Sequence, residues 1–249
     1  WKMTWEGYIA ATNLERDIYL DLRPQYVIAI RKIDGLSEHA RNRTIEHVIL
    51  VFIHGLEDLN QSLLKRLAAS EKPEVRSAIF RSMGFYLNSL VKKPEVKGVG
   101  EITDRCREYW EWRLNELEPS GEGERAAITK ELEMVTELFI SIPSLEEEDI
   151  SKLSRTVDLT DGKVERPQEI IDKFKENPKI DAMATLGILK RIVRAEYPDW
   201  ERDFWRKDLY SLLEILFVSE DDDVRQAVKM VAEISVKQGF FEFEKFTTL

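Results

Sequence analysis

SEKPEVRSAIFRSMGF (Ser70–Phe85) and SEDDDVRQAVKMVAEI (Ser219–Ile234) open with the same pattern, in which Ser, Glu, Val, Arg and Ala stand at equal offsets. In both places an apolar segment with helical spacing ends just before the pattern, at Leu67 and at Phe217. Ser-Glu is typical of a short polar turn, and Val-Arg begins the next amphipathic stretch. The pattern therefore predicts the corner of a helical hairpin, with Ala placed where the two helices approach closely.

Helical periodicity dominates the rest of the chain. From Thr44 to Leu67, apolar residues recur at steps of three and four, which predicts one helix face that bends or breaks at Gly55. Only 11 glycines and 8 prolines occur, which disfavours an all-β fold with its many turns. The connections between helical stretches are short, so consecutive helices should pack antiparallel.

The two corners resemble the junction between the two helices of one HEAT repeat, a class of α-solenoid. The separation of 149 residues, from Ser70 to Ser219, fits three or four steps of a helical unit of roughly 37 to 47 residues. The resemblance implies an all-α fold, an α-solenoid of antiparallel helix pairs. It also implies that Arg76 and Arg225 tie neighbouring repeats together through polar contacts.

We expect three segments in the chain: N-terminal helical repeats over residues 1–143, an acidic short helix and linker over 144–167, and C-terminal helical repeats over 168–249. The middle segment contains the breakers Gly162 and Pro167. The whole is expected to be one continuous solenoid. Because the sequence starts at Trp1 without an initiator Met, we expect it to be a piece of a longer protein.

Net charge argues against two classes of partner. The formal charge is −10 and the isoelectric point is near 5.1, so the surface repels phosphate backbones and anionic lipid. The longest apolar run, Val48 to Ile53, is far too short for a membrane span. We therefore expect no membrane association and a cytoplasmic location. The single cysteine, Cys106, excludes an internal disulfide and is expected to be a buried thiol.

Motifs for catalysis and for cofactor binding are missing from the sequence. No phosphate-binding glycine loop and no nucleophile elbow occurs. His47 and His54 are two helical turns apart, too far for one metal ion, and EEED (Glu146–Asp149) lacks the spacing of a calcium loop. We expect no metal, no cofactor and no enzymatic activity.

Candidate partner-binding residues follow from the HEAT resemblance, in which the second helix of each pair lines the binding surface. The positions of those helices that lie off the core stripe should contact a partner, as should Trp112, which lies off the stripe of its own helix. We expect a protein-binding, scaffold or regulatory module that binds another protein or a basic peptide segment. The candidate residues are Phe80, Arg81, Trp112, Lys229 and Met230.

Two alternatives involve nucleic acid. The first is a nucleic-acid-binding regulatory domain that uses a local patch of basic residues for anions. The second is a HEAT-like DNA glycosylase, whose size and helical content suit the chain, but no basic groove with a catalytic Asp among aromatics can be matched. The basic patch would consist of Lys190, Arg191, Arg194, Arg202, Arg206 and Lys207.

Overall fold

The computed structural model describes residues 12–92, 98–117, 121–178 and 180–248. Over these ranges every regular element is helical: twelve α-helices and two 3₁₀-helices, so the prediction of an all-α fold is confirmed. The elements are α2 Thr12–Arg31, η1 Ile33–Gly35, α3 Glu38–Ile53, α4 Leu63–Ala68, α5 Pro73–Val91, α6 Val99–Glu116, α7 Glu122–Leu132, α8 Val135–Ser141, α9 Glu147–Leu159, α10 Pro167–Glu176, α11 Ala182–Arg194, α12 Asp199–Phe217, α13 Asp222–Lys237 and η2 Phe241–Phe246.

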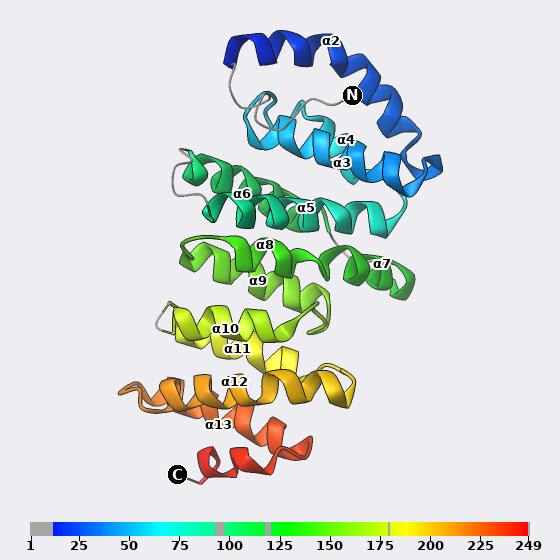
Figure 1. Cartoon of the computed structure of the whole chain (residues 1–249). Helices are drawn as coiled ribbons and strands as arrows, with labels where there is room; N and C mark the ends of the chain where they lie inside the picture. The colour runs from blue at the N-terminus through cyan, green and yellow to red at the C-terminus, as the bar shows by residue number, and fades with distance from the viewer. Residues whose placement is uncertain (1–11, 93–97, 118–120, 179, 249) are drawn as a thin grey trace.

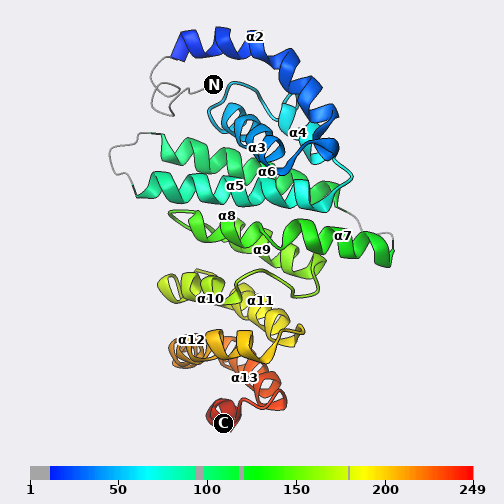
Figure 2. The same cartoon turned by 45° about the vertical axis from the view of Figure 1, so that its right-hand side comes forward.

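The helices stack in chain order, with α2 at one end of the molecule and η2 at the other (Figure 1). From α5 onward they form two layers, which are also apparent in the rotated view (Figure 2). In the first layer α5 packs on α7 and α8, α8 on α10, and α10 on α12. In the second layer α6 packs on α9, α9 on α11, and α11 on α13. None of the helices in the described ranges is long and apolar enough to cross a membrane.

The two copies of the repeated pattern occupy different layers. The second copy joins α12 to α13, the two helices of one pair, as the sequence predicts. The first copy joins α4 to α5, and α5 is the first helix of the pair α5/α6. Between the two corners lie the pair α5/α6, the helices α7 and α8 packed together on α9, the pair α10/α11 and the single helix α12, so the second copy falls in the opposite layer. The expectation that both corners lie within one repeat is therefore wrong for Ser70–Phe85.

The two arginines of the pattern also differ in their long-range contacts. Arg76 donates to the backbone carbonyl of Ser70 in its own corner, and its Nε lies 2.6 Å from a carboxylate oxygen of Glu131 in α7. Arg225 donates to the carbonyl of Ser219 at 2.5 Å and pairs with Asp222, both in its own corner. Arg76 thus connects neighbouring units as predicted. Among the described residues, the hydrogen bonds and ion pair of Arg225 stay within its own turn.

The stretch predicted as one helix from Thr44 to Leu67 is two helices, α3 and α4. Gly55 adopts a φ of 71°, which is left-handed backbone that favours glycine, and it ends the first helix. The connecting loop is held by Glu57, which accepts from the Leu63 amide at 2.6 Å and from Arg23 Nε at 2.7 Å. The chain break expected at this glycine is therefore present.

The segment predicted to be an acidic short helix and linker, residues 144–167, contains helix α9, which is packed against its neighbours. Helix α9 contacts α6, α8 and α11 and buries Ile150, Leu153 and Val157. The loop after it is tethered by the Tyr197 hydroxyl, which donates to the Gly162 carbonyl at 2.8 Å and accepts from the Val164 amide at 2.9 Å. The segment therefore contacts helices that precede it in the chain and helices that follow it. The division of the chain there remains a sequence prediction.

Helices α5 and α8 approach closely at Gly84, which lies inside α5 and is buried. A Cβ atom added to Gly84 would overlap the backbone carbonyl of Glu137 and the amide of Leu138. Backbone therefore packs directly on backbone where these two helices of the first layer cross.

Candidate protein-binding surface

A charged hollow of about 440 Å³ lies between α6 and α9 on the outer face of the second layer. Asp104, Glu108 and Glu111 reach it because they are spaced four and three residues apart on α6, opposite the buried face of that helix. Residues of α9 at similar spacing form the other wall. Every lining side chain except one serine is ionisable. The lining residues are Asp104, Arg107, Glu108, Glu111, Glu148, Ser151, Lys152 and Arg155.

The Arg107 guanidinium is fixed by a buried carboxylate on one side of the hollow. Its Nε and Nη2 donate to the two carboxylate oxygens of Asp149 at 2.9 and 2.7 Å, and Asp149 is fully buried. Nη1 lies 2.8 Å from a carboxylate oxygen of Glu146 and 3.1 Å from one of Asp104. Burial acts to lower the pKa of Arg107, but the hydrogen bonds to Asp149 and Asp104 outweigh it and raise that pKa. The charge of Arg107 is thus permanent and neutralised.

The second arginine of the hollow is also paired. Arg155 of α9 donates to Glu111 at 2.8 Å and to Asn115 at 2.7 Å, both on α6. Around the hollow the six carboxylates Asp104, Glu108, Glu111, Glu146, Glu148 and Asp149 face the three cations Arg107, Lys152 and Arg155. Glu108 and Glu148 are exposed, and neither forms a salt bridge within the described residues. The surface of the hollow is therefore negative, with two exposed carboxylates at its rim.

The partner-binding residues predicted from the sequence do not form one surface. Phe80 is fully buried and packs on Tyr109 with ring centroids 5.3 Å apart, so the prediction that it contacts a partner is wrong. Arg81 is exposed on α5 in the first layer, whereas Lys229 and Met230 lie on α13 in the second. The reason is the change of layer between the two copies of the pattern.

Trp112 is half-buried at the junction of α4 and α6. Its ring lies 4.8 Å from Lys65 Nζ and 6.0 Å from the Arg113 guanidinium carbon, and it packs on Tyr109. Much of this ring is therefore used in contacts within the chain.

The predicted basic patch is divided between helices of different layers. Arg191 on α11 pairs with Asp158 of α9. On α12, Arg202 lies 3.1 Å from a carboxylate oxygen of Asp199. Arg206, also on α12, contacts Glu242 at 2.8 Å and Asp203 at 3.3 Å. Three of the six residues are therefore paired with carboxylates. Lys190, Arg191 and Arg194 belong to α11, and Arg202, Arg206 and Lys207 belong to α12.

The other polar residues considered from the sequence have structural contacts. A ring nitrogen of His47 lies 3.3 Å from the Tyr26 hydroxyl, and one of His54 lies 2.8 Å from the Tyr86 hydroxyl. In the described part of the chain, no three His, Cys, Asp or Glu side chains are grouped so that they could hold a metal ion. Cys106 is buried as predicted, and burial raises the pKa of its thiol to about 12.

No protein-family model matches the sequence, and no curated protein and no solved structure matches it either. The resemblance to HEAT repeats thus rests on the repeated pattern and on the helix stack.

The hollow itself was not predicted from the sequence. Its α6 wall belongs to a stretch whose aromatics are mostly predicted to face the core, and its α9 wall lies in the segment predicted to be an acidic short helix and linker. The carboxylates at positions 104, 108 and 111 were nevertheless a usable signal, because their spacing already places them on one helix face.

Proposed function

We propose that the chain is an α-solenoid of the HEAT-like type that works as a non-enzymatic protein-binding module, and that it binds a basic peptide segment in the hollow between α6 and α9. The stacking of helix pairs in chain order supports the first part. Such stacks present long surfaces built from successive helices. The negative hollow supports the second part and is the observation that carries the proposal.

The fixed charges of the hollow suit a lysine- or arginine-rich partner. Arg107 is already held by buried Asp149, so it needs no rearrangement when a cation binds nearby. Glu108 and Glu148 are left to receive the cations of the partner at an exposed rim. Such complementarity contributes chiefly to specificity and to the rate of association, and salt weakens it.

The double variant Glu108→Lys, Glu148→Lys tests this proposal. The probe is a short fluorescein-labelled peptide rich in lysine and arginine, titrated with the protein and followed by fluorescence anisotropy. We expect the wild-type protein to bind it and the double variant to lose on the order of tenfold or more in affinity. Added salt should weaken wild-type binding more than it weakens the residual binding of the variant.

Asp223→Lys, Glu233→Lys is the matched control. It makes the same change of net charge on α13, with one residue in the first turn of the helix and one further along, as in the test variant. Equal losses in the two double variants would reduce the effect to net charge and reject the hollow as the site. Titrations with DNA and RNA test the nucleic-acid alternative. The pairing of arginines in the basic patch argues against that alternative.

A further inference from the structure

Helix α12 carries a row of exposed apolar side chains on one face. Trp200, Phe204, Ile215 and Val218 are 65%, 63%, 45% and 80% exposed. Together with Lys207 and Ser211 they recur at steps of three and four residues, so they form one continuous stripe, here called the α12 stripe. Single exposed apolar residues are common on protein surfaces, but four of them aligned on one helix face are a mark of an interface.

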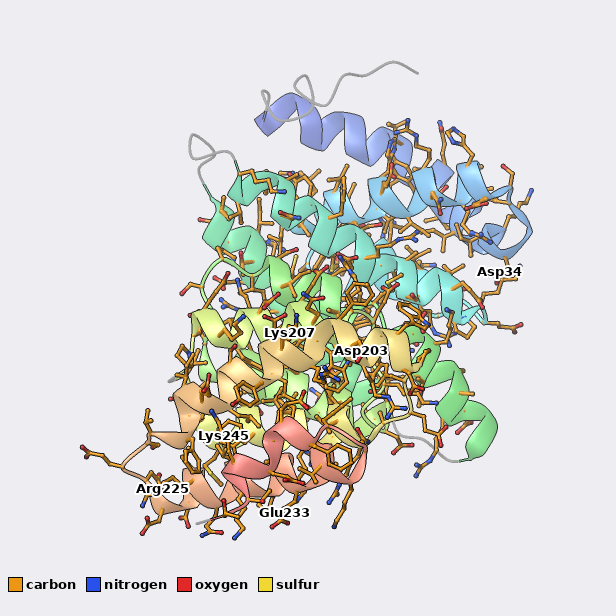
Figure 3. The ribbon with its side chains drawn as sticks, turned by 60° about the horizontal axis from the view of Figure 1, so that its bottom comes forward. Asp34, Asp203, Lys207, Arg225, Glu233 and Lys245 are labelled. Carbon is orange, nitrogen blue, oxygen red and sulfur yellow. The ribbon has the colours of Figure 1, made fainter. Side chains whose placement is uncertain are left out.

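The α12 stripe lies opposite the face that joins the helix to the rest of the molecule. Leu209, Leu212 and Leu216 fill the buried face, and α12 also contacts α10 and α13. On one flank, Tyr210 is covered by Phe243 of η2, with ring centroids 5.5 Å apart. Figure 3 shows Asp203 and Lys207 on α12 and Lys245 on η2. The stripe is thus directed outward, and no described element packs on it.

The arrangement of side chains on the stripe is self-complementary. An aromatic pair, Trp200 and Phe204, lies at one end, with ring centroids 6.2 Å apart, and an aliphatic pair lies at the other. Between them stand Lys207 and, at the edge of the stripe, Glu214, with small Ser211 in the middle. One carboxylate oxygen of Glu214 lies 2.5 Å from Lys245 Nζ of η2 in an exposed pair, and its second oxygen is open to a further cation. If the direction of the helix is reversed, the aliphatic pair takes the place of the aromatic pair, and negative Glu214 takes the place of positive Lys207.

We propose that α12 is a dimerisation helix, which packs antiparallel on α12 of a second copy of this chain. A two-fold axis between Tyr210 and Ser211 places Lys207 of each copy against Glu214 of the other. Both residues lie toward the same side of the stripe, and this axis keeps that side in common, so the two opposite charges meet twice. The symmetry is that of an isologous dimer, in which one patch recognises itself.

The same axis also matches the apolar ends. Trp200 and Phe204 of one copy cover Ile215 and Val218 of the other, and the small side chain of Ser211 lets the helices approach at the centre. A parallel pairing would instead set Lys207 against Lys207 and Glu214 against Glu214. Like charges placed opposite each other cost free energy, so the antiparallel arrangement is the one the charges select.

The proposed dimer should be weak and dependent on concentration. One helix from each copy makes the main contact, which puts the interface at the small end of the range seen for specific complexes. We expect a dissociation constant on the order of micromolar. The inference does not depend on the proposed peptide-binding function, because the hollow lies on the other layer.

A charge swap tests the pairing. Sedimentation velocity over a concentration series should show a monomer–dimer equilibrium for the wild-type protein. Lys207→Glu and Glu214→Lys should each weaken the dimer on the order of tenfold, and the double variant should restore it. Lys237→Glu, an exposed change on α13, should leave it unaffected. A wild-type protein that stays monomeric through the series, or a double variant no better than the singles, would overturn the proposal.

A cysteine at the axis gives an independent measurement. Cys106 is buried, so Ser211→Cys introduces a single accessible thiol next to its own copy across the axis. Mild oxidation should link most of this variant into covalent dimers, because the helices meet at disulfide distance there. Asn88→Cys on the exposed face of α5 is the control, and circular dichroism confirms that both variants fold. Equal cross-linking of the two variants would contradict the proposed axis.

Discussion

Glu131 is fully buried between two arginines. Its carboxylate oxygens accept from Arg76 Nε at 2.6 Å and from Arg113 Nη2 at 2.9 Å, so one side chain of α7 joins α5 and α6. Removing one member of such a cluster leaves the remaining buried charges without compensation, which is far more costly than the net stabilisation that the intact cluster provides.

We therefore expect Glu131→Ala to lower the free energy of unfolding by about 3 kcal/mol. Urea denaturation followed by circular dichroism measures the change. Glu46→Ala is the control, because Glu46 forms an exposed pair with Arg43 at 3.5 Å and its loss should cost less than about 1 kcal/mol. Similar losses in the two variants would show that the buried cluster contributes no more than a surface pair.

Glu165 is the residue from which a pH dependence is expected. Partial burial and the nearby charge of Glu133 raise the pKa of its carboxyl, while Lys130 and Arg81 partly offset them. A carboxyl whose pKa is higher in the folded state favours folding when it is protonated. That contribution is fully present below the pKa of the unfolded chain, about 4.3, and is lost as pH rises through the folded pKa.

Glu165→Gln should therefore be more stable than the wild-type protein at pH 7, and the difference should vanish near pH 4. Urea midpoints of both proteins at the two pH values measure it. Because Glu165 is only partly buried, the gain should be modest. A variant less stable than the wild type at neutral pH would contradict the assigned cause.

At the scale of elements, Gly84 sets how closely α5 and α8 pack. Alanine there would force the two backbones apart, so Gly84→Ala should lower the free energy of unfolding by at least about 2 kcal/mol. Gly100→Ala in α6 is the control, since its added Cβ would meet no atom within 4 Å and alanine favours a helix. It should be neutral or stabilising by up to about 1 kcal/mol. Urea denaturation of both variants shows whether the loss of stability comes from the backbone contact at Gly84 or from replacing any helical glycine.

The helices themselves could be predicted from the sequence, because an apolar residue every three or four positions is a local signal. Their pairing could not. The repeated pattern specifies a turn followed by a helix start, and that is what both copies form, but nothing in it states to which neighbour the new helix belongs. Phe80 was assigned to a binding surface for this reason, although it lies in the core beside Tyr109. Gly84 is a similar case, since its role depends on the backbone of α8.

At the scale of the whole molecule, each helix contacts mainly its neighbours along the stack, and η2 closes the end formed by α12 and α13. Phe246 of η2 is buried against Tyr210 and Phe217, with ring centroids 5.3 and 5.4 Å apart. A defect here should therefore loosen nearby helices and leave distant ones protected.

Phe246→Ala should destabilise the protein by about 3 kcal/mol and speed amide hydrogen exchange in α12 and α13 much more than in α5. Hydrogen exchange read by mass spectrometry measures the difference between helices. Phe241→Ala, in the same 3₁₀-helix but 66% exposed, should change little. Exchange that accelerates equally along the whole stack would instead show that the chain unfolds as a single cooperative unit.

The candidate site was harder to predict than the fold. The acidic hollow arises from two helices more than thirty positions apart in the sequence, and only packing brings Glu108 near Glu148. Packing has the opposite effect on the predicted basic patch, where it pairs several of the charges. Its arginines are numerous in the sequence, yet Asp158 and Glu242 from neighbouring elements pair with Arg191 and Arg206.

The chain alternates between two layers. Whether the number of helices between two surfaces is odd or even therefore decides whether those surfaces lie on the same side of the molecule. The hollow and the α12 stripe now face opposite sides, so a bound peptide and a second copy would not compete. Loss or gain of one helix between α9 and α12 would bring both onto the same side, whereas loss or gain of two would keep them apart. Length changes in this stack should therefore be tolerated in whole pairs only.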